Sequence, residues 1–364
     1  MTSMMMTKKS PPIPARHVLR FSWKLVVILS ITLCVLAFFK LHSQPDLYSS
    51  PSSLSIARSR VSRHGNNFSG PPKIAFLFLA RRSLPSIFSG AASSRMLTCR
   101  IFRFIFTRRL VGWGESSMIE AERLLFTTAL EDPANQRFVL LSDSCVPLYN
   151  FSYIYNYLMA SPRSFVDSFL DVKEGRYNPK MSPNIPKQKW RKGSQWIALV
   201  RSHAEVLVDD EVVLPAFRKF CKRRPPLDAR KGKLNIKLQK QHNCIPDEHY
   251  VQTLLTMSER EDELERRTLT YTLWNSSATK TESKGWHPMT FTHANAAPHK
   301  IKEIKEINHV YYETEYRTEW CRVNSTYVPC FLFARKFSQG AAMRLLSEGV
   351  VGQFDTSSLL DPPP

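Results

Sequence analysis

An uninterrupted apolar segment near the beginning of the chain is the strongest constraint on what this protein can fold into. Residues 25–39 contain no charge, proline or glycine, and Lys24 and Lys40 flank them. A helix of this length covers roughly 22 Å, and the flanking lysines can reach the polar surface of a bilayer whose hydrocarbon core is about 30 Å thick. We therefore expect residues 25–41 to be a transmembrane helix that is retained, with a cleaved signal peptide as the alternative.

The charges around this segment predict its orientation. Five basic residues and no acidic residue precede it, and the cytoplasmic flanks of membrane helices are enriched in Lys and Arg. The expected topology is therefore single-pass type II, with most of the chain in a lumen. Ser, Pro and Arg then dominate without sustained periodicity, which is typical of an extended stem. The expected division is a cytoplasmic tail (1–24), a signal anchor (25–41), a stem (42–72), a lumenal domain (73–355) and a tail (356–364).

The net charge of +20 suggests a nucleic-acid binder only until it is located. Residues 1–114 hold 17 Lys and Arg against the single acid Asp46, a balance of +16, and the remaining 34 basic and 30 acidic side chains give only +4. A groove for phosphate backbones needs its excess of cations on the folded domain. We therefore expect no nucleic-acid partner.

The cysteines and glycosylation sequons fit an oxidising lumen. Six cysteines lie beyond the apolar segment, and disulfides persist in such compartments. Six cysteines allow fifteen pairings, and we propose only Cys321 with Cys330, because these two are close in sequence. Four N-x-S/T sequons add weak support for a lumenal glycoprotein. They are Asn67, Asn150, Asn275 and Asn324.

Behind the stem, apolar runs and helical patterns alternate. Residues 73–80 (KIAFLFLA) and 137–142 (RFVLLS) are short apolar runs typical of strands buried on both faces. Between them, residues 116–130 place apolar side chains near helical spacing. The pattern predicts an α/β domain with a mixed, mainly parallel sheet flanked by helices. Further elements are expected over 153–159, 194–200, 202–208, a helix over 246–257, 267–274 and 330–334.

Several common catalytic motifs are absent from the sequence. It contains no G-x-G-x-x-G, P-loop, H-E-x-x-H, C-x-x-C or G-x-S-x-G pattern. An Asp-x-Asp pair after a buried strand, which would hold a metal on a diphosphate, is also missing, because the strand ending at Ser142 continues as Asp143-Ser144. The acidic runs 209–211 and 261–263 are interpreted as solvated faces. We therefore expect no metal site.

Two groups of charged residues are candidates for chemistry. Asp247 and Glu248 follow Pro246 at the start of a predicted helix, where acids commonly serve as caps, and catalysis would require one carboxylate to face a cleft. Arg317 and the pair Arg335-Lys336 could bind a diphosphate when no metal does. The alternative for Arg317 is a surface ion pair with neighbouring glutamates.

Five segments together resemble one family, the plant branch of the core-2/I-branching β-1,6-N-acetylglucosaminyltransferases. They occur in the family's order, and the resemblance extends from Lys73 to about Val351 except for residues 83–111. The segments are residues 113–122 (WGESSMIEAE), 141–148 (LSDSCVPL), 192–196 (KGSQW), 244–249 (CIPDEH) and 333–337 (FARKF).

The resemblance implies a GT-A-like glycosyltransferase fold and an inverting reaction without a metal or other cofactor. Glu248 matches the family's general base, which removes the proton of the acceptor hydroxyl. Arg317 and Lys336 match the residues that bind the diphosphate of a UDP-sugar, and Asp143 lies in the loop that approaches the donor, with a turn-forming role as its alternative. Trp274 resembles an aromatic residue of the acceptor site, with a core role as its alternative.

The expected function is transfer of a sugar from a UDP-sugar to a glycan or glycoprotein hydroxyl in the Golgi lumen. N-acetylglucosamine is the preferred choice for this sugar. Glucuronic acid is the alternative donor sugar. Residues 83–111 depart from the family pattern, because the helix and following strand of the donor-binding half are missing there. We expect this loss to leave backbone groups of the neighbouring strand unpaired, at about 1 to 3 kcal/mol for each buried group. A membrane-tethered protein that binds glycans or partners without catalysis is therefore the competing hypothesis.

Overall fold

The structure is a computed structural model, and it describes residues 68–80, 102–106, 111–112, 114–173, 175–223, 243–274, 288–323 and 326–349. The contacts divide the chain into units of residues 1–55 and 56–364, and every described residue belongs to the second unit. Within the described ranges, no helix is both long and apolar enough to cross a bilayer. The predicted anchor, residues 25–41, lies outside those ranges.

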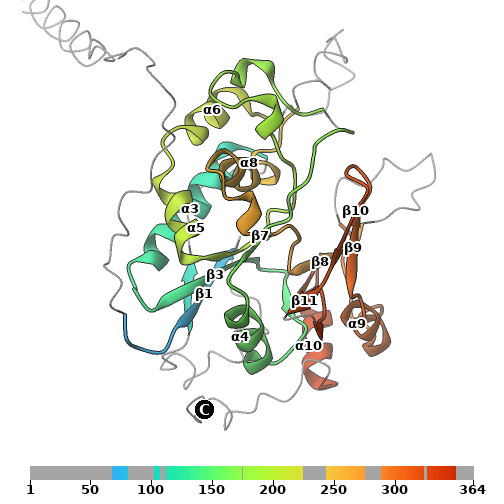
Figure 1. Cartoon of the computed structure of the whole chain (residues 1–364). Helices are drawn as coiled ribbons and strands as arrows, with labels where there is room; N and C mark the ends of the chain where they lie inside the picture. The colour runs from blue at the N-terminus through green and yellow to red at the C-terminus, as the bar shows by residue number, and fades with distance from the viewer. Residues whose placement is uncertain are drawn as a thin grey trace, which may run out of the picture. The chain divides into compact units, whose positions relative to one another are not determined.

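A six-stranded sheet forms the centre of the second unit (Figure 1). The strand order is β2-β1-β3-β6-β5-β7, and the sheet is mixed. Strand β1 pairs in parallel with β2 and β3, β6 runs antiparallel to β3 and β5, and β5 pairs in parallel with β7. The prediction of a mixed α/β domain is therefore confirmed. The strands are β1 (Lys73–Leu79), β2 (Phe102–Phe106), β3 (Asn135–Ser142), β5 (Ser164–Phe165), β6 (Ala198–Val200) and β7 (Leu264–Glu265).

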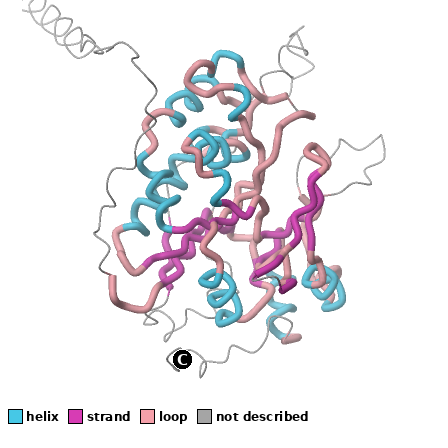
Figure 2. The backbone as a smooth tube through the Cα atoms, in the orientation of Figure 1, coloured by secondary structure: helices cyan, strands magenta, loops and turns pink. Residues whose placement is uncertain are grey.

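Helices cover both faces of this sheet, as Figure 2 shows. Alternate residues of a strand point to opposite faces. In β1, Ala75 and Leu77 therefore pack with one group of helices, whereas Phe76 and Phe78 pack with another helix. The double burial explains why the strands are continuous apolar runs. The first group is α3 (Ser116–Leu130), α5 (Arg201–Asp209), α6 (Val213–Phe220) and α8 (Tyr250–Met257), and the helix on the other face is α4 (Phe151–Ala160).

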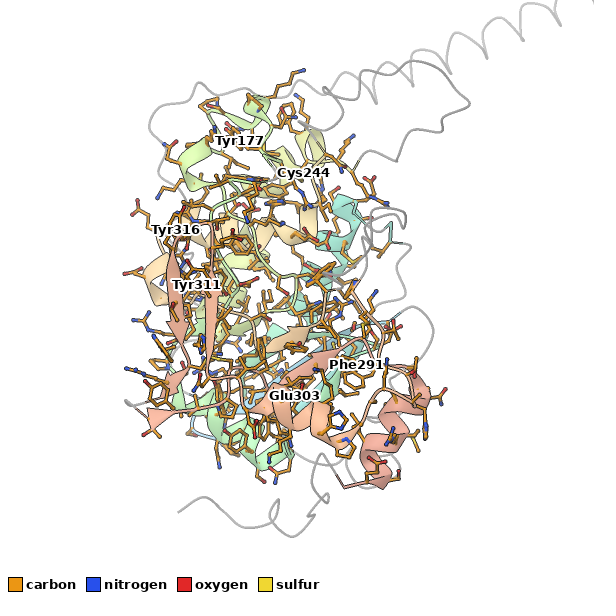
Figure 3. All side chains as sticks on the ribbon, turned by 90° about the vertical axis from the view of Figure 1, so that its right-hand side faces the viewer. Tyr177, Cys244, Phe291, Glu303, Tyr311 and Tyr316 are labelled. Carbon is orange, nitrogen blue, oxygen red and sulfur yellow. A yellow bond between two sulfur atoms is a disulfide. The ribbon has the colours of Figure 1, made fainter. Side chains whose placement is uncertain are left out.

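A smaller sheet and two hairpins follow the central sheet. The smaller sheet has the order β4-β13-β8, and α9 and α10 pack with it in a separate apolar cluster. Figure 3 shows one hairpin, β9–β10, with Tyr311 and Tyr316 on its exposed surface. These elements are β4 (Val146–Pro147), β8 (Thr270–Thr272), β9 (His309–Tyr312), β10 (Arg317–Trp320), β11 (Arg322–Val323), β12 (Thr326–Tyr327), β13 (Phe333–Arg335), α9 (Pro298–Lys305) and α10 (Gln339–Ser347).

Short 3-10 helices complete the described elements. The predicted helix over 246–257 is divided into η4 (Pro246–Glu248) and α8, and His249 lies between them. Because η4 ends before α8 begins, the acidic pair Asp247-Glu248 occupies a separate turn. The other 3-10 helices are η2 (Pro179–Met181), η3 (Lys187–Lys189) and η5 (Glu261–Glu263).

The atypical segment 83–111 contributes a strand, contrary to the expectation of an unpaired sheet edge. Strand β2 lies within it and pairs in parallel with β1, from Ile74 opposite Phe102 to Phe78 opposite Phe106. The backbone groups of β1 that a missing strand would leave unpaired therefore have a neighbour. This strand was not predicted because its segment mixes apolar and basic residues, whereas β1 and β3 are continuous apolar runs.

Two disulfides join loops of the domain. Cys321 is bonded to Cys330, the pair proposed from the sequence, and Cys221 is bonded to Cys244. The second pair was not proposed, because its 23-residue separation gives no preference over the other pairings. Cys145 is free and buried.

The two acidic runs lie at the surface, as predicted, with Glu211, Asp262 and Glu263 exposed, but some of their acids also make specific contacts. The Asp210 carboxylate caps α6 by accepting hydrogen bonds from the backbone N–H groups of Val213 and Leu214 at 2.8 and 2.7 Å. Glu261 accepts two hydrogen bonds from Arg191, and Glu263 is 2.9 Å from the buried His203 ring. Glu261 and Glu263 therefore connect η5 to Arg191 and to His203 of α5, which are distant in sequence. In the described ranges, no three His, Cys, Asp or Glu residues are gathered where they could hold a metal ion.

Candidate functional site

The carboxylate of Glu248 forms an ion pair at the end of η4. Its Oε2 atom is 2.5 Å from Nη1 of Arg176, and the side chains of Glu248 and Arg176 are 26% and 12% exposed. Pro246 opens the turn, and the backbone N–H of Glu248 donates to the carbonyl of Ile245 at 3.1 Å. The turn therefore presents Glu248 in a sheltered position that solvent still reaches. Asp247 and Glu248 both lie in the first turn of η4, and the Glu248 carboxylate contacts the Arg176 guanidinium there.

Arg176 is fixed by contacts that also involve the residue after Glu248. The Asp171 carboxylate accepts from the backbone N–H of Arg176 at 2.8 Å and from the Trp190 indole at 3.2 Å. The Trp190 ring stacks on His249 with ring centroids 4.4 Å apart. Nδ1 of His249 donates to the carbonyl of Arg191 at 2.8 Å, because a carbonyl can only accept, and burial lowers the pKa of His249 to about 3. The neutral His249 ring therefore contacts Trp190, which is linked through Asp171 to Arg176, and it directly follows Glu248 in the chain.

Asp247 lies beside the base candidate but is directed into the protein. It is 5% exposed, and its Oδ1 atom has no hydrogen-bond partner in the described part of the chain. Burial, followed by the charge of Glu248, raises the pKa of Asp247 to about 7. The two neighbouring carboxyls therefore differ in environment: one is partly exposed and ion-paired, and the other is buried.

The loop 192–196 connects the parts of the site. The backbone N–H of Gly193 donates to the carbonyl of Glu248 at 2.9 Å, and the Gln195 amide donates to the buried Glu122 carboxyl of α3 at 2.7 Å. A Cβ atom at Gly193 would lie 1.7 Å from the carbonyl oxygen of Asp167. Only glycine therefore permits this close approach, which explains its place in the loop.

Arg335 approaches the same loop from β13. Its guanidinium lies over the Trp196 ring at 4.4 Å, and its charge interacts with those of Asp143 and Asp247. Burial lowers the pKa of Arg335, and its Nε atom has no hydrogen-bond partner among the described residues. Asp143 lies in the turn after β3, which β13 approaches because Ala334 pairs with Val146. The structure therefore brings Asp143, Asp247 and Arg335 into one electrostatic cluster.

Lys336 directly follows β13 and is half-buried. Its carbonyl accepts from the N–H of Phe291 at 2.7 Å, and the next N–H, that of Phe337, donates to Ser144 at 2.9 Å. These bonds place Lys336 beside the turn that contains Asp143. The role of the Arg335-Lys336 pair stays a prediction, and the charge of Arg335 also interacts with that of Asp247 in the Glu248 turn.

Arg317 has acidic partners of its own on the β9–β10 hairpin. Its guanidinium forms ion pairs with Glu315, at 2.8 Å, and with Glu319, and it lies 4.1 Å from the centre of the Tyr312 ring. The Tyr312 hydroxyl donates to the Asp167 carboxylate at 2.5 Å, and the same carboxylate accepts from the N–H of Ser194. Arg317 thus reaches the loop 192–196 through Tyr312 and Asp167, and the ion pairs weighed as its alternative are present.

Trp274 is exposed, and the alternative of a core tryptophan is therefore excluded. It is 54% exposed and follows β8 by two residues. Because Thr272 of β8 pairs with Arg335 of β13, the chain approaching Trp274 runs beside Arg335 and Lys336. Its side chain is therefore accessible at the surface, two residues beyond the strand that pairs with β13.

Of the four sequons, only Asn150 lies in the described residues. Asn150 is exposed and caps α4, because its side-chain oxygen accepts from the N–H of Tyr153 at 2.9 Å. Asn67, Asn275 and Asn324 lie outside the described ranges.

Sequence reasoning missed Arg176, the connecting role of the loop 192–196, and the burial of Asp247 and Glu122. In the loop, Gly193 between the polar residues Lys192 and Ser194 was the available signal that another backbone segment packs closely against this one. No local signal identifies Arg176, which is 72 residues from Glu248.

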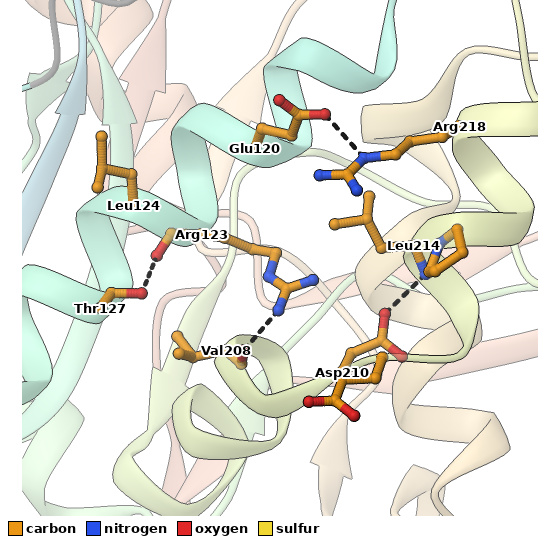
Figure 4. A pocket seen from close by; sticks show the side chains of 10 residues that line it. Glu120, Arg123, Leu124, Thr127, Val208, Asp210, Leu214 and Arg218 are labelled. Atoms are coloured by element: carbon orange, nitrogen blue, oxygen red, sulfur yellow. Dashed lines mark hydrogen bonds and ion pairs between the residues drawn. The ribbon is translucent and has the colours of Figure 1, made fainter. Parts of the chain in front are cut away.

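A separate cavity lies between α3, α5 and α6 (Figure 4). It encloses about 470 Å³ and is bordered by an ion pair between Arg218 and Glu120 at 2.8 Å. On the same helix, Glu122 is buried and contacts Gln195 instead. None of Glu248, Arg176 or Arg335 lines this cavity, so it is distinct from the candidate site.

Comparisons with known proteins show which family the chain belongs to. The family model of the core-2/I-branching enzymes matches residues 88–305. This range begins inside the atypical segment 83–111. A rice protein named Glycosyltransferase BC10, from Oryza sativa subsp. japonica, is 49% identical over 318 residues, which cover 80% of each chain.

Proposed function

The chain belongs to the core-2/I-branching enzyme family and is a glycosyltransferase, and from this premise we propose that it transfers N-acetylglucosamine from a UDP donor to a glycan hydroxyl. The proposed reaction inverts the anomeric carbon, needs no divalent metal and takes place on a GT-A-like fold. The observation that carries the proposal is the sheltered Glu248 carboxylate, held by Arg176 within the cluster that includes Arg335 and Asp143.

Glu248 is the proposed general base. The acceptor oxygen attacks the anomeric carbon while the bond from that carbon to the phosphate oxygen breaks, and the electron pair leaves with UDP. The acceptor's proton passes to a Glu248 oxygen. Arg176 fixes one carboxylate oxygen by its 2.5 Å contact, which leaves the other oxygen for the acceptor hydroxyl. One carboxylate is enough, because the diphosphate leaves as an anion and requires charge stabilisation more than a proton.

The cations beside Asp143 are proposed to stabilise the leaving diphosphate. Lys336 and Arg335 are adjacent, and a guanidinium offers a planar set of donors to phosphate oxygens. At about 4 Å and an effective dielectric of about 20, each cation contributes about 4 kcal/mol before desolvation is subtracted. Arg317 can join them only if the diphosphate displaces Glu315 or Glu319, because both now neutralise it.

We propose that the acceptor glycan stacks on Trp274. A sugar ring presents an apolar face that packs on a flat aromatic side chain. The exposed ring lies just past the strand that pairs with β13, which supports a position next to the donor cations.

We also propose that the domain lies in the Golgi lumen behind a retained membrane anchor. The apolar run over residues 25–39 supports the anchor. The disulfides Cys221–Cys244 and Cys321–Cys330 support an oxidising compartment. Protease protection of the full chain in sealed microsomes tests this topology, and digestion of the domain by added protease would contradict it.

A transfer assay tests the activity. The full-length chain in detergent is incubated with UDP-N-acetylglucosamine or UDP-glucuronic acid, a glycan acceptor panel and a chelator. We expect N-acetylglucosamine transfer that persists in chelator and yields an inverted linkage. Glu248→Gln, which keeps the shape of the side chain, should reduce kcat by about 10² to 10⁴-fold. Transfer of glucuronic acid alone would change the donor assignment. Glycan binding without any UDP binding or transfer would favour the non-catalytic hypothesis.

A further inference from the structure

Asp247 is an ionisable side chain in the site that the transfer reaction does not use. It is 5% exposed, it adjoins the base, and its Oδ1 atom has no hydrogen-bond partner among the described residues. A buried polar atom without a partner costs stability. The cost of burying this unpartnered oxygen suggests that Asp247 has a role in the site.

Charged groups face Asp247 from each element packed against it. Glu248 is its neighbour on η4, Glu122 approaches from α3, Arg176 from the loop after β5, and Arg335 from β13. Burial raises the pKa of Glu122 well above its ordinary value, and its carboxyl accepts a hydrogen bond from Gln195. The charge balance of the cluster therefore depends on whether Asp247 is ionised.

Arg335 is the cation whose attraction for an anionic ligand depends on the charge of Asp247. Arg176 already forms an ion pair with Glu248, whereas no carboxylate of the described residues forms an ion pair with Arg335, which rests on the Trp196 ring. When Asp247 is neutral, Asp143 is the remaining carboxylate among the described residues whose charge opposes that of Arg335, so more of the Arg335 charge is left for an anionic ligand. An ionised Asp247 opposes that charge from within the protein.

We propose that Asp247 is a positioning residue that acts through Arg335: it supports binding of the anionic donor when protonated and weakens binding when ionised. This inference rests on the proposed function, because it requires a diphosphate ligand at Arg335. It adds a proton-dependent control of donor affinity to the transfer site.

The electrostatic environment gives the direction of the pH dependence. Burial and the charge of Glu248 raise the pKa of Asp247 to about 7. Below that pH, Asp247 is neutral and donor affinity is high. Above it, Asp247 is ionised and donor affinity falls, so the site binds donor more tightly in a mildly acidic lumen than at alkaline pH.

The test compares UDP binding by the full-length chain and by its Asp247→Asn variant, measured by calorimetry in detergent at pH 6 and pH 8. Asparagine keeps the shape and remains neutral. We expect the ratio of wild-type to variant Kd to be about 1 at pH 6 and about 10 at pH 8, the change expected from one added charge near the ligand. The titration of UDP itself cancels in this ratio.

Two further variants separate the inference from a general structural effect. Glu122→Gln replaces another buried acid of the same cluster, whose pKa is also raised by burial, and it should keep the wild-type pH dependence. Arg335→Gln should weaken UDP binding about tenfold at pH 6 but only about twofold at pH 8, because the ionised Asp247 already opposes Arg335 there.

The outcomes distinguish this inference from the proposed function. UDP binding with the same wild-type to Asp247→Asn ratio at both pH values would overturn the role of Asp247 and leave the transfer function intact. No UDP binding by either protein at either pH would overturn the transfer function and the inference together. A thermal unfolding curve of each variant at both pH values verifies that the proteins compared are folded.

Discussion

Nη1 of Arg176 and Oε2 of Glu248 are 2.5 Å apart, although the two residues are 72 positions apart in the chain. Arg176 is held in turn through Asp171 to Trp190, which stacks on His249. The orientation of the proposed base therefore depends on a side chain from another part of the fold.

Removing Arg176 should impair catalysis more than donor binding. Arg176→Ala releases the Glu248 carboxylate, and a misplaced base should reduce kcat on the order of tenfold to a hundredfold with little change in the Kd for UDP. Arg176→Lys should restore part of the rate. Lys180→Ala, an exposed cation nearby, is the matched control and should leave kcat unchanged. Equal losses in the two alanine variants would contradict the positioning role.

A side chain at Gly193 should disrupt the connecting loop. The added Cβ of Gly193→Ala would lie 1.7 Å from the Asp167 carbonyl oxygen, so we expect a loss of about 3 kcal/mol in unfolding free energy. The control is Gly340→Ala in α10, where the nearest atom is 3.7 Å away and a gain of about 0.5 to 1 kcal/mol is expected. Chemical denaturation measures both, and a neutral Gly193→Ala would refute the close approach.

The two disulfides should contribute unequally to stability. Loop-closure entropy assigns about 3.4 kcal/mol to Cys221–Cys244, with its separation of 23 residues, and about 2.6 kcal/mol to Cys321–Cys330, with its separation of 9. Double Cys→Ser variants of each pair, compared by thermal unfolding, should follow this order. Unchanged unfolding after loss of the first pair would argue that it is not formed in the protein.

Asp247→Asn should stabilise the fold at high pH. The pKa of Asp247 is raised from 3.8 to about 7, so between these values the unfolded chain loses a proton that the folded chain keeps, and stability falls as pH rises. The variant has no carboxyl to ionise, so its free energy of unfolding should exceed that of the wild type by up to about 4 kcal/mol at pH 8. Near pH 4 the two free energies should be equal. Thermal unfolding at both pH values checks the prediction, and an equal difference at both would contradict it.

Trp274→Ala should weaken acceptor binding without affecting the donor. Loss of a stacking surface should raise the acceptor KM about tenfold, and the Kd for UDP should stay constant. Trp320→Ala removes another tryptophan that is 47% exposed, on β10, and it should leave both constants unchanged. A similar rise in KM in both variants would place the acceptor elsewhere.

Much of the architecture was predictable from local patterns. The helix expected over residues 116–130 is α3 with the same bounds, and the apolar runs from Lys73 and Arg137 form β1 and β3. These predictions succeed because burial on both faces requires continuous apolar residues. Strand β2 was missed, since its irregular sequence lacks that pattern, and pairing with β1 determines its structure instead.

The site was predictable only in part. The Pro246-Asp247-Glu248 turn and the Arg335-Lys336 pair could be selected because their residue types suit proton transfer and phosphate binding. The ion pairs of Arg317 with Glu315 and Glu319 were open as an alternative, and they are present. The capping by Asp210 was not foreseen, because a run of acids gives no indication of which one meets helix N–H groups.

By itself, the sequence determined which segments are apolar enough to form the sheet, which residues are candidates for the site, and which family the chain resembles. Only the tertiary structure decided that Arg176 meets Glu248, that Asp247 is buried while its neighbour is not, and that Arg335 rests on Trp196. Local patterns specify burial and backbone conformation over a few residues. Contacts between distant side chains, and the charge states that follow from them, arise only when packing removes water around them.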